Sequence, residues 1–128
     1  MTTVSPDGTP HHAFHSEDEW SRRPGGDLVL ALLDGSRTSG NLVAGSWATL
    51  LTLNGAGPAT LLARLKGKPR RCRTDHSRSL YVLRVVREIP ARVLPGEEAR
   101  WKGSLAYERR MVPEESARRK TLSEEVSG

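Results

Sequence analysis

The strongest secondary-structure signal in this sequence is the run from Leu80 to Ile89, which reads LYVLRVVREI. It is rich in β-branched residues, and Pro90 follows it. Side chains of this kind favour a strand, and a proline is typical of a strand end. The run therefore predicts a β-strand, which in turn predicts a fold built around a sheet.

The two faces of this strand differ in character. Because alternate residues of a strand point to opposite sides of the sheet, Tyr81, Leu83 and Val85 should share one apolar face. Arg78 and Arg84 should share the other face. Much of the strand is nevertheless apolar on both sides, and one small domain offers little cover for two faces. We therefore expect a homodimer joined through this strand and through a later helix that carries Trp101.

Three further elements are expected upstream of this strand. Residues 28–33 (LVLALL) read as a strand that ends at the turn Asp34-Gly35. Residues 41–54 read as a second strand, in which Gly45 marks a bulge or a close backbone approach. Pro58 suits the first turn of a helix, and the leucines that follow it form one helical face.

The flanking segments complete the expected organisation. Residues 1–26 read as a flexible tail, apart from a short helix at 16–20 that carries Trp20. A helix over 95–112 presents Trp101 on an apolar face, and residues 113–128 read as a charged helix or tail. These elements predict an α+β domain over 27–112, with an antiparallel sheet, helices on one face, and the sheet continued across the homodimer.

Composition narrows the class of protein. The chain has 128 residues, 36% of them apolar, and carries a net charge of +5. No apolar run approaches the roughly 18 residues of a membrane span, so no membrane partner is expected. Cys72 is the only cysteine, which rules out an internal disulfide framework and a multi-cysteine zinc site. No catalytic constellation stands out, so we expect neither an enzyme, nor a cofactor, nor a metal site.

The charge is concentrated at the expected joint between a helix and the main strand. Five cations fall within eight residues, namely Lys66, Lys68, Arg70, Arg71 and Arg73. Clustered cations are typical of phosphate-binding surfaces, because each neutralised phosphate releases condensed counterions. A solvated surface face is the other interpretation of such a run. The density of this cluster favours nucleic acid, with Arg78 and Arg84 extending the surface along the strand.

The three tryptophans call for separate interpretations. Trp47 and Trp101 lie on apolar elements, where core packing is the default. Trp20 has few apolar neighbours in sequence, and an exposed indole can stack on a base or cap the end of a duplex. Whether Trp20 caps a duplex or only anchors the tail stays open at this stage.

Four stretches together resemble the small RNA-silencing suppressors of tombusviruses and aureusviruses. They are Asp18-Glu19-Trp20, the segment from Arg37 to the Gly45-Ser46-Trp47 motif, the segment from Cys72 to Val85, and the carboxy-terminal amphipathic helix. In that family two tryptophans lie three residues apart, whereas Glu17 stands at the first position here. This difference favours binding of RNA duplexes without strict selection of their length.

The resemblance implies a viral protein of the host cytoplasm that suppresses RNA silencing. Its homodimer would bind double-stranded RNA, including small interfering RNA, without reading the base sequence. The residues expected to contact RNA are Trp20, Arg37, Ser46, Lys66, Lys68, Arg70, Arg71, Arg73, Arg78 and Arg84. The alternative is a small basic DNA-binding regulator from a GC-rich genome, although no helix-turn-helix pattern is visible.

Overall fold

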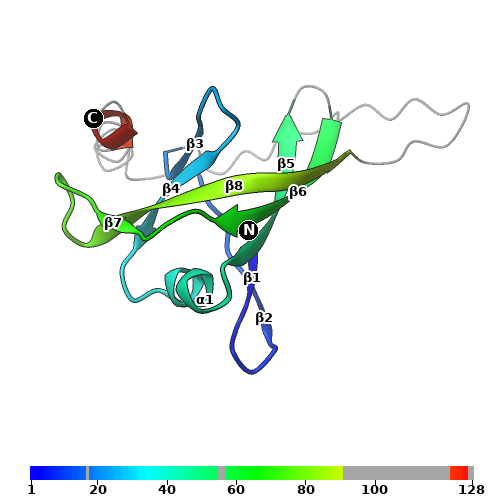
Figure 1. The fold of residues 1–128 in the computed structure, drawn as a ribbon, viewed down its shortest axis with the longest axis horizontal. Helices are drawn as coiled ribbons and strands as arrows, with labels where there is room; N and C mark the ends of the chain where they lie inside the picture. The colour runs from blue at the N-terminus through cyan, green and yellow to red at the C-terminus, as the bar shows by residue number, and fades with distance from the viewer. Residues whose placement is uncertain (17, 55–56, 91–121, 127–128) are drawn as a thin grey trace, which may run out of the picture.

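The computed structural model describes residues 1–16, 18–54, 57–90 and 122–126, which form an α+β fold around one antiparallel sheet (Figure 1). The strands are β1 (Thr2–Val4), β2 (Pro10–His12), β3 (Trp20–Arg22), β4 (Leu28–Leu33), β5 (Trp47–Asn54), β6 (Gly57–Leu65), β7 (Arg70–Arg71) and β8 (Arg78–Pro90). Helix α1 spans Arg37–Gly45, and a short helix covers residues 122–126. Within the described residues, no helix is long and apolar enough to cross a membrane.

The sheet is organised around β8, its longest strand. The strand order is β2-β1-β5-β6-β8-β4-β3, and β7 adds to β8 beyond the end of β6. Two predicted strands are confirmed, since β4 covers the expected residues 28–33 and β8 contains the run from Leu80 to Ile89. The turn after β4 also forms as expected, with Gly35 at φ 75°.

The core lies on both faces of the sheet. The larger cluster includes Leu28 and Leu30 of β4, Tyr81 and Leu83 of β8, and Leu42 of α1. This confirms the predicted apolar face of the main strand. On the other face, a smaller cluster consists of Val29 and Ala31 of β4, Leu80 of β8, Cys72 and Leu122. The two described helices thus pack on opposite faces of the sheet, which differs from the expected single helical face (Figure 1).

The segment before Trp47 is helical, so the prediction of a strand from residue 41 is wrong at its beginning. Ser36 caps the amino end of α1, because its hydroxyl accepts a hydrogen bond from the Ser39 amide. Ser46 ends the helix in the left-handed conformation at φ 64°, and its amide donates to the Leu42 carbonyl. These two local caps outweigh the strand preference of Leu42 and Val43.

The segment after Pro58 is a strand, so the predicted helix at this position is wrong. β6 lies between β5 and β8 and pairs antiparallel with both. Its residues alternate, since Leu61 and Ala63 are buried whereas Arg64 is exposed. Two flanking strands satisfy the backbone of β6 on both sides, and this tertiary pairing outweighs the helical spacing of the leucines.

The amino-terminal segment belongs to the sheet, which corrects the expectation of a flexible tail with a Trp-bearing helix. β1 pairs with β2 and β5, and β3 pairs with β4. The amide of Asn41 in α1 donates to the hydroxyls of Thr3 and Ser5, at 3.1 and 3.2 Å. Polar contacts of this kind attach the segment without an apolar run in the sequence.

The expected carboxy-terminal elements are described only in part. Glu17 and the expected Trp101 helix lie outside the described residues. Within the predicted charged segment 113–128, residues 122–126 form a helix whose Leu122 is buried.

Candidate nucleic-acid interface

An open area of the sheet carries a row of cations next to an exposed indole. Arg84 of β8 lies opposite Arg64 of β6, which lies opposite Trp47 of β5. Side chains of directly opposed residues stand on the same face of a sheet and close together. Both arginines are exposed and the Trp47 side chain is 43% exposed. The Arg64 guanidinium lies 5.5 Å from the centre of the Trp47 ring, within range of a cation–π contact.

A β-bulge in β8 brings a third arginine onto the same face. Leu62 pairs with Arg87 and Ala63 with Val85, so Val86 is the extra residue of β8 at this point. Without it, strand alternation would place Arg84 and Arg87 on opposite faces, because they are three residues apart. The bulge therefore aligns them.

The neighbouring positions on this face are neutral. Leu51 and Ile89 both lie opposite Thr60, and their exposed fractions are 68% and 43%. Thr49 lies opposite Leu62. We refer to this surface as the basic platform; it consists of Trp47, Thr49, Leu51, Thr60, Leu62, Arg64, Arg84, Arg87 and Ile89. It combines cations with hydroxyls, an indole and apolar groups, the side chains that contact phosphate, ribose and bases in nucleic-acid complexes.

The predicted cation cluster is mostly paired with acids. Lys66 forms an ion pair with Asp27 at 2.8 Å, Arg70 one with Glu125 at 2.8 Å, and Arg71 a longer one with Asp34 at 3.9 Å. The side chains of Lys68 and Arg73 are exposed and make no ion pair within the part of the chain that the structure describes. The cluster is thus less available to a ligand than its sequence suggests.

The pKa of Asp27 responds to cations of both the cluster and the basic platform. The hydrogen bond from Lys66 is the main cause that lowers the pKa of Asp27. The charges of Lys66, Arg84 and Arg23 lower it further. Arg84 therefore interacts electrostatically with the Asp27 carboxylate, although it makes no ion pair within the described residues.

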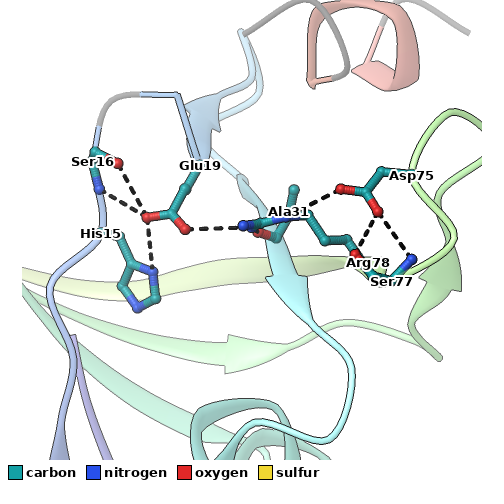
Figure 2. Close-up of polar contacts among 7 residues, drawn as sticks. All are labelled: His15, Ser16, Glu19, Ala31, Asp75, Ser77 and Arg78. Carbon is teal, nitrogen blue, oxygen red and sulfur yellow. Dashed lines mark hydrogen bonds and ion pairs between the residues drawn. The ribbon is translucent and has the colours of Figure 1, made fainter. Parts of the chain in front are cut away.

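Arg78 lies inside the protein, so its predicted place on the RNA-facing surface is wrong. Its guanidinium contacts Glu19 at 3.3 Å and Asp75 at 3.4 Å, and it donates to the Ala31 carbonyl at 2.9 Å (Figure 2). The side chain is only 8% exposed. Although Arg78 shares the strand parity of Arg84, it faces the small core cluster, where two carboxylates compensate its charge.

His15 lies beside this network (Figure 2). Its Nδ1 is 3.9 Å from a Glu19 carboxylate oxygen, and neither ring nitrogen has a hydrogen-bond partner in the described residues. Burial lowers the pKa of His15, the negative charge of Glu19 opposes this shift, and the amino terminus and Arg78 add to it. The environment of this mostly buried imidazole therefore favours its neutral form.

The residues implied by the family resemblance do not come together. Trp20 lies on β3 opposite Leu30 and packs against the larger core cluster, so the premise that it lacks apolar neighbours is wrong. Arg37 begins α1 and Ser46 ends it, and α1 packs against the face opposite the platform. The Leu42–Gly45 part of the presumed strand motif is helical.

Sequence reasoning missed Trp47 and Arg64 as site residues. The sequence feature that could have placed Arg64 is an alternation with a period of two, in which Thr60, Leu62 and Arg64 share one face of a strand and Leu61, Ala63 and Leu65 share the other. The described residues contain no group of three or more His, Cys, Asp or Glu side chains that could hold a metal ion. No protein-family model, curated protein or solved structure matches the chain.

Proposed function

We propose that this protein binds double-stranded RNA across the basic platform, without reading the base sequence. The observation that carries the proposal is the pair formed by Arg84 and Arg64, which lie directly opposite each other on adjacent strands. Like charges that face each other across two strands are destabilising. Such a pair lowers the stability of the fold. A phosphate lying over both guanidinium groups would compensate both charges.

The composition of the platform agrees with duplex RNA. The deep major groove of A-form RNA hides its base edges, so proteins recognise it through phosphates and 2′-hydroxyls. Arg64, Arg84 and Arg87 supply phosphate ligands, and the Thr49 and Thr60 hydroxyls can donate to or accept from a ribose. None of these groups requires a particular base.

The biological role that we attach to this binding is sequestration of short RNA duplexes from a silencing machinery. This is the role implied by the resemblance to viral suppressors, and with it come a host-cytoplasmic location and a homodimer. The far half of β8 supports a dimer, because its pairing with β4 ends at Leu83 whereas its pairing with β6 runs to Pro90. Within the part of the chain that the structure describes, this edge of β8 has no partner strand beyond Leu83, and such an edge can pair with a second copy of the chain.

Single-stranded RNA is the second candidate, and Trp47 favours it. An exposed indole on a basic sheet face can stack on an unpaired base, and stacking is independent of sequence. Duplex DNA is the corresponding ligand for a DNA-binding regulator. The three nucleic acids differ in groove shape and base accessibility, so one experiment compares them.

The test is a titration of the purified full chain with labelled duplex RNA, single-stranded RNA and duplex DNA of equal length, over a range of salt concentrations. We expect duplex RNA to bind most tightly, with a steep loss of affinity as salt rises. Equal affinity for duplex DNA would contradict the proposal, and so would affinity independent of salt. Tighter binding of the single strand would favour the second candidate.

A charge-matched pair of variants locates the surface. Arg84→Gln should lower the salt slope by about one unit, because one phosphate contact is lost. Arg22→Gln is the control, since Arg22 lies opposite Leu28, on the core side of the sheet, and its contact with Glu88 at 3.5 Å is exposed. Equal losses in the two variants would mean that binding responds to net charge alone and not to the platform.

A further inference from the structure

The carboxylate of Glu125 occupies a site built from three donors of the segment 70–74. The Arg70 guanidinium donates to one carboxylate oxygen at 2.8 Å. The backbone amides of Arg73 and Thr74 both donate to the other oxygen. The Glu125 side chain is only 3% exposed. Burial alone would raise the pKa of Glu125, but the hydrogen bonds from Arg73, Arg70 and Thr74 lower it overall.

This donor set suits oxyanions in general. Two successive backbone amides that converge on one oxygen form a concave anion site, and a guanidinium adds a charged donor. The same geometry serves a carboxylate or a phosphate, because both present oxygens that accept from a planar fork. Arg70 and Arg73 also belong to the cation cluster that the sequence singled out for phosphate binding.

The helix that carries Glu125 also packs against the small core cluster. Leu122 is buried against Val29, Ala31, Cys72 and Leu80, and Val126 is partly buried at the same cluster. The described part of this helix, residues 122–126, is held by the packing of Leu122 and Val126 and by the polar contacts of Glu125. Displacing Glu125 should therefore weaken the docking of residues 122–126.

The site lies on the same face of the sheet as the basic platform. Leu80 and Val82 of β8 face the small cluster under the helix, and Arg84 follows at the next position of the same parity. The helix thus covers one part of a face whose other part is open. A ligand that extends along β8 from the platform would meet the Glu125 helix.

We propose that the Arg70 guanidinium with the Arg73 and Thr74 amides forms a second phosphate site, which Glu125 occupies in the free protein. A backbone phosphate of bound RNA replaces the Glu125 carboxylate, so RNA binding and docking of residues 122–126 exclude each other. The inference rests on the proposed RNA binding. It adds an internal competitor whose removal should tighten that binding.

The test compares Glu125→Gln with Glu124→Gln, an equal change of charge at an exposed neighbouring position. Glu125→Gln should tighten binding of duplex RNA several-fold and raise the salt slope by about one unit relative to Glu124→Gln. Adding Arg70→Ala to Glu125→Gln should cancel the gain, because the charged donor of the phosphate site is then missing.

Two measurements follow the helix itself. Cys72, the only cysteine, is 1% exposed in the cluster that contains Leu122, so its alkylation rate reports undocking in the free protein. Glu125→Gln should increase that rate. In the wild-type protein, duplex RNA should increase deuterium exchange at the amides of residues 122–126.

The outcomes separate this inference from the proposed function. If RNA binds at the platform but leaves exchange at residues 122–126 unchanged, the second site is wrong and the proposed function stands. The second site is also wrong, and the proposed function again stands, if Glu125→Gln and Glu124→Gln bind RNA equally. If no variant binds RNA, both proposals are overturned.

Discussion

Arg64 and Arg84 face each other from adjacent antiparallel strands on the open face of the sheet. Neither makes an ion pair within the described residues, and the charge of Arg84 is one of the causes that lower the pKa of Asp27. Directly opposed like charges cost stability. A feature that weakens the fold without serving its packing is typical of a functional site.

The first prediction separates stability from binding at this pair. Arg84→Thr should raise the free energy of unfolding by about 0.2–1 kcal/mol, because it removes the repulsion and adds a residue with high β-propensity. The same variant should bind duplex RNA more weakly. Urea unfolding and RNA titration measure the two effects. A loss of stability in Arg84→Thr would show that the guanidinium has a favourable partner in the fold.

The second prediction contrasts two tryptophans. Trp47→Ala should leave stability nearly unchanged, because the side chain is 43% exposed, and should weaken single-stranded RNA binding by about 1–3 kcal/mol if bases stack on it. Trp20→Ala should instead destabilise the fold by about 2 kcal/mol, below the range of about 3–5 for a fully buried tryptophan, because Trp20 is half-buried. If Trp20→Ala reduced binding of short duplexes beyond any loss of folded protein, the end-stacking interpretation of Trp20 would be supported after all.

The third prediction concerns the buried guanidinium. Arg78→Met should lower the free energy of unfolding by about 3 kcal/mol, the low end for removing one partner of a buried ion pair. The low end applies because the Glu19 and Asp75 side chains are 18% and 34% exposed and keep some hydration. Thermal and urea unfolding measure the loss. Under conditions in which the variant is folded, the salt slope of RNA binding should stay at the wild-type value. A slope lower by about one unit would instead mean that Arg78 contacts the RNA.

The fourth prediction follows from His15. Its pKa is lowered in the folded protein, so the unfolded chain binds a proton more readily. Stability should therefore fall as pH drops below the ordinary histidine value of 6.5, and the loss should continue until the pH reaches the folded-state pKa. Unfolding by urea between about pH 8 and about pH 5 covers this window.

His15→Leu is the matched variant for this pH dependence. It should lose the fall in stability that begins near the histidine value, because it has no proton to bind. The amino group of Met1 also has a lowered pKa, but the loss of stability that it causes begins below its ordinary value of 8.0 and is present in both proteins. Asp75 and Glu125 have lowered pKa values as well, but their contributions disappear only below their ordinary values of 3.8 and 4.5. An unchanged pH profile in His15→Leu would assign the dependence to another group.

The parts of the fold that could be predicted from sequence are those in which local preference and tertiary environment agree. β4 and residues 80–83 of β8 are apolar and paired with each other, so pattern and packing lead to the same result. β6 shows the opposite case, since its leucines fit a helix as well as a strand. Only the presence of β5 and β8 on its two sides decides between them.

The sequence indicated which kinds of side chain the candidate site contains, but not which positions form it. Arg84 follows from strand parity, whereas its alignment with Arg87 depends on the bulge at Val86, which no local residue signals. The exclusion of Arg78 depends on Glu19 and Asp75, which are distant from each other in sequence. The charge run 66–73 was visible in the sequence, but its pairing with Asp27, Asp34 and Glu125 required the fold.

The central position of β8 also affects how the chain is made. β8 is the last strand of the described residues, yet β4, β6 and β7 all hydrogen-bond to it. On the ribosome, β4 emerges long before Tyr81 can pair with Leu30, so an apolar strand stays without its partner during synthesis. A nascent chain that stalls before β8 should therefore be prone to aggregation and should depend on chaperones that shield exposed strands.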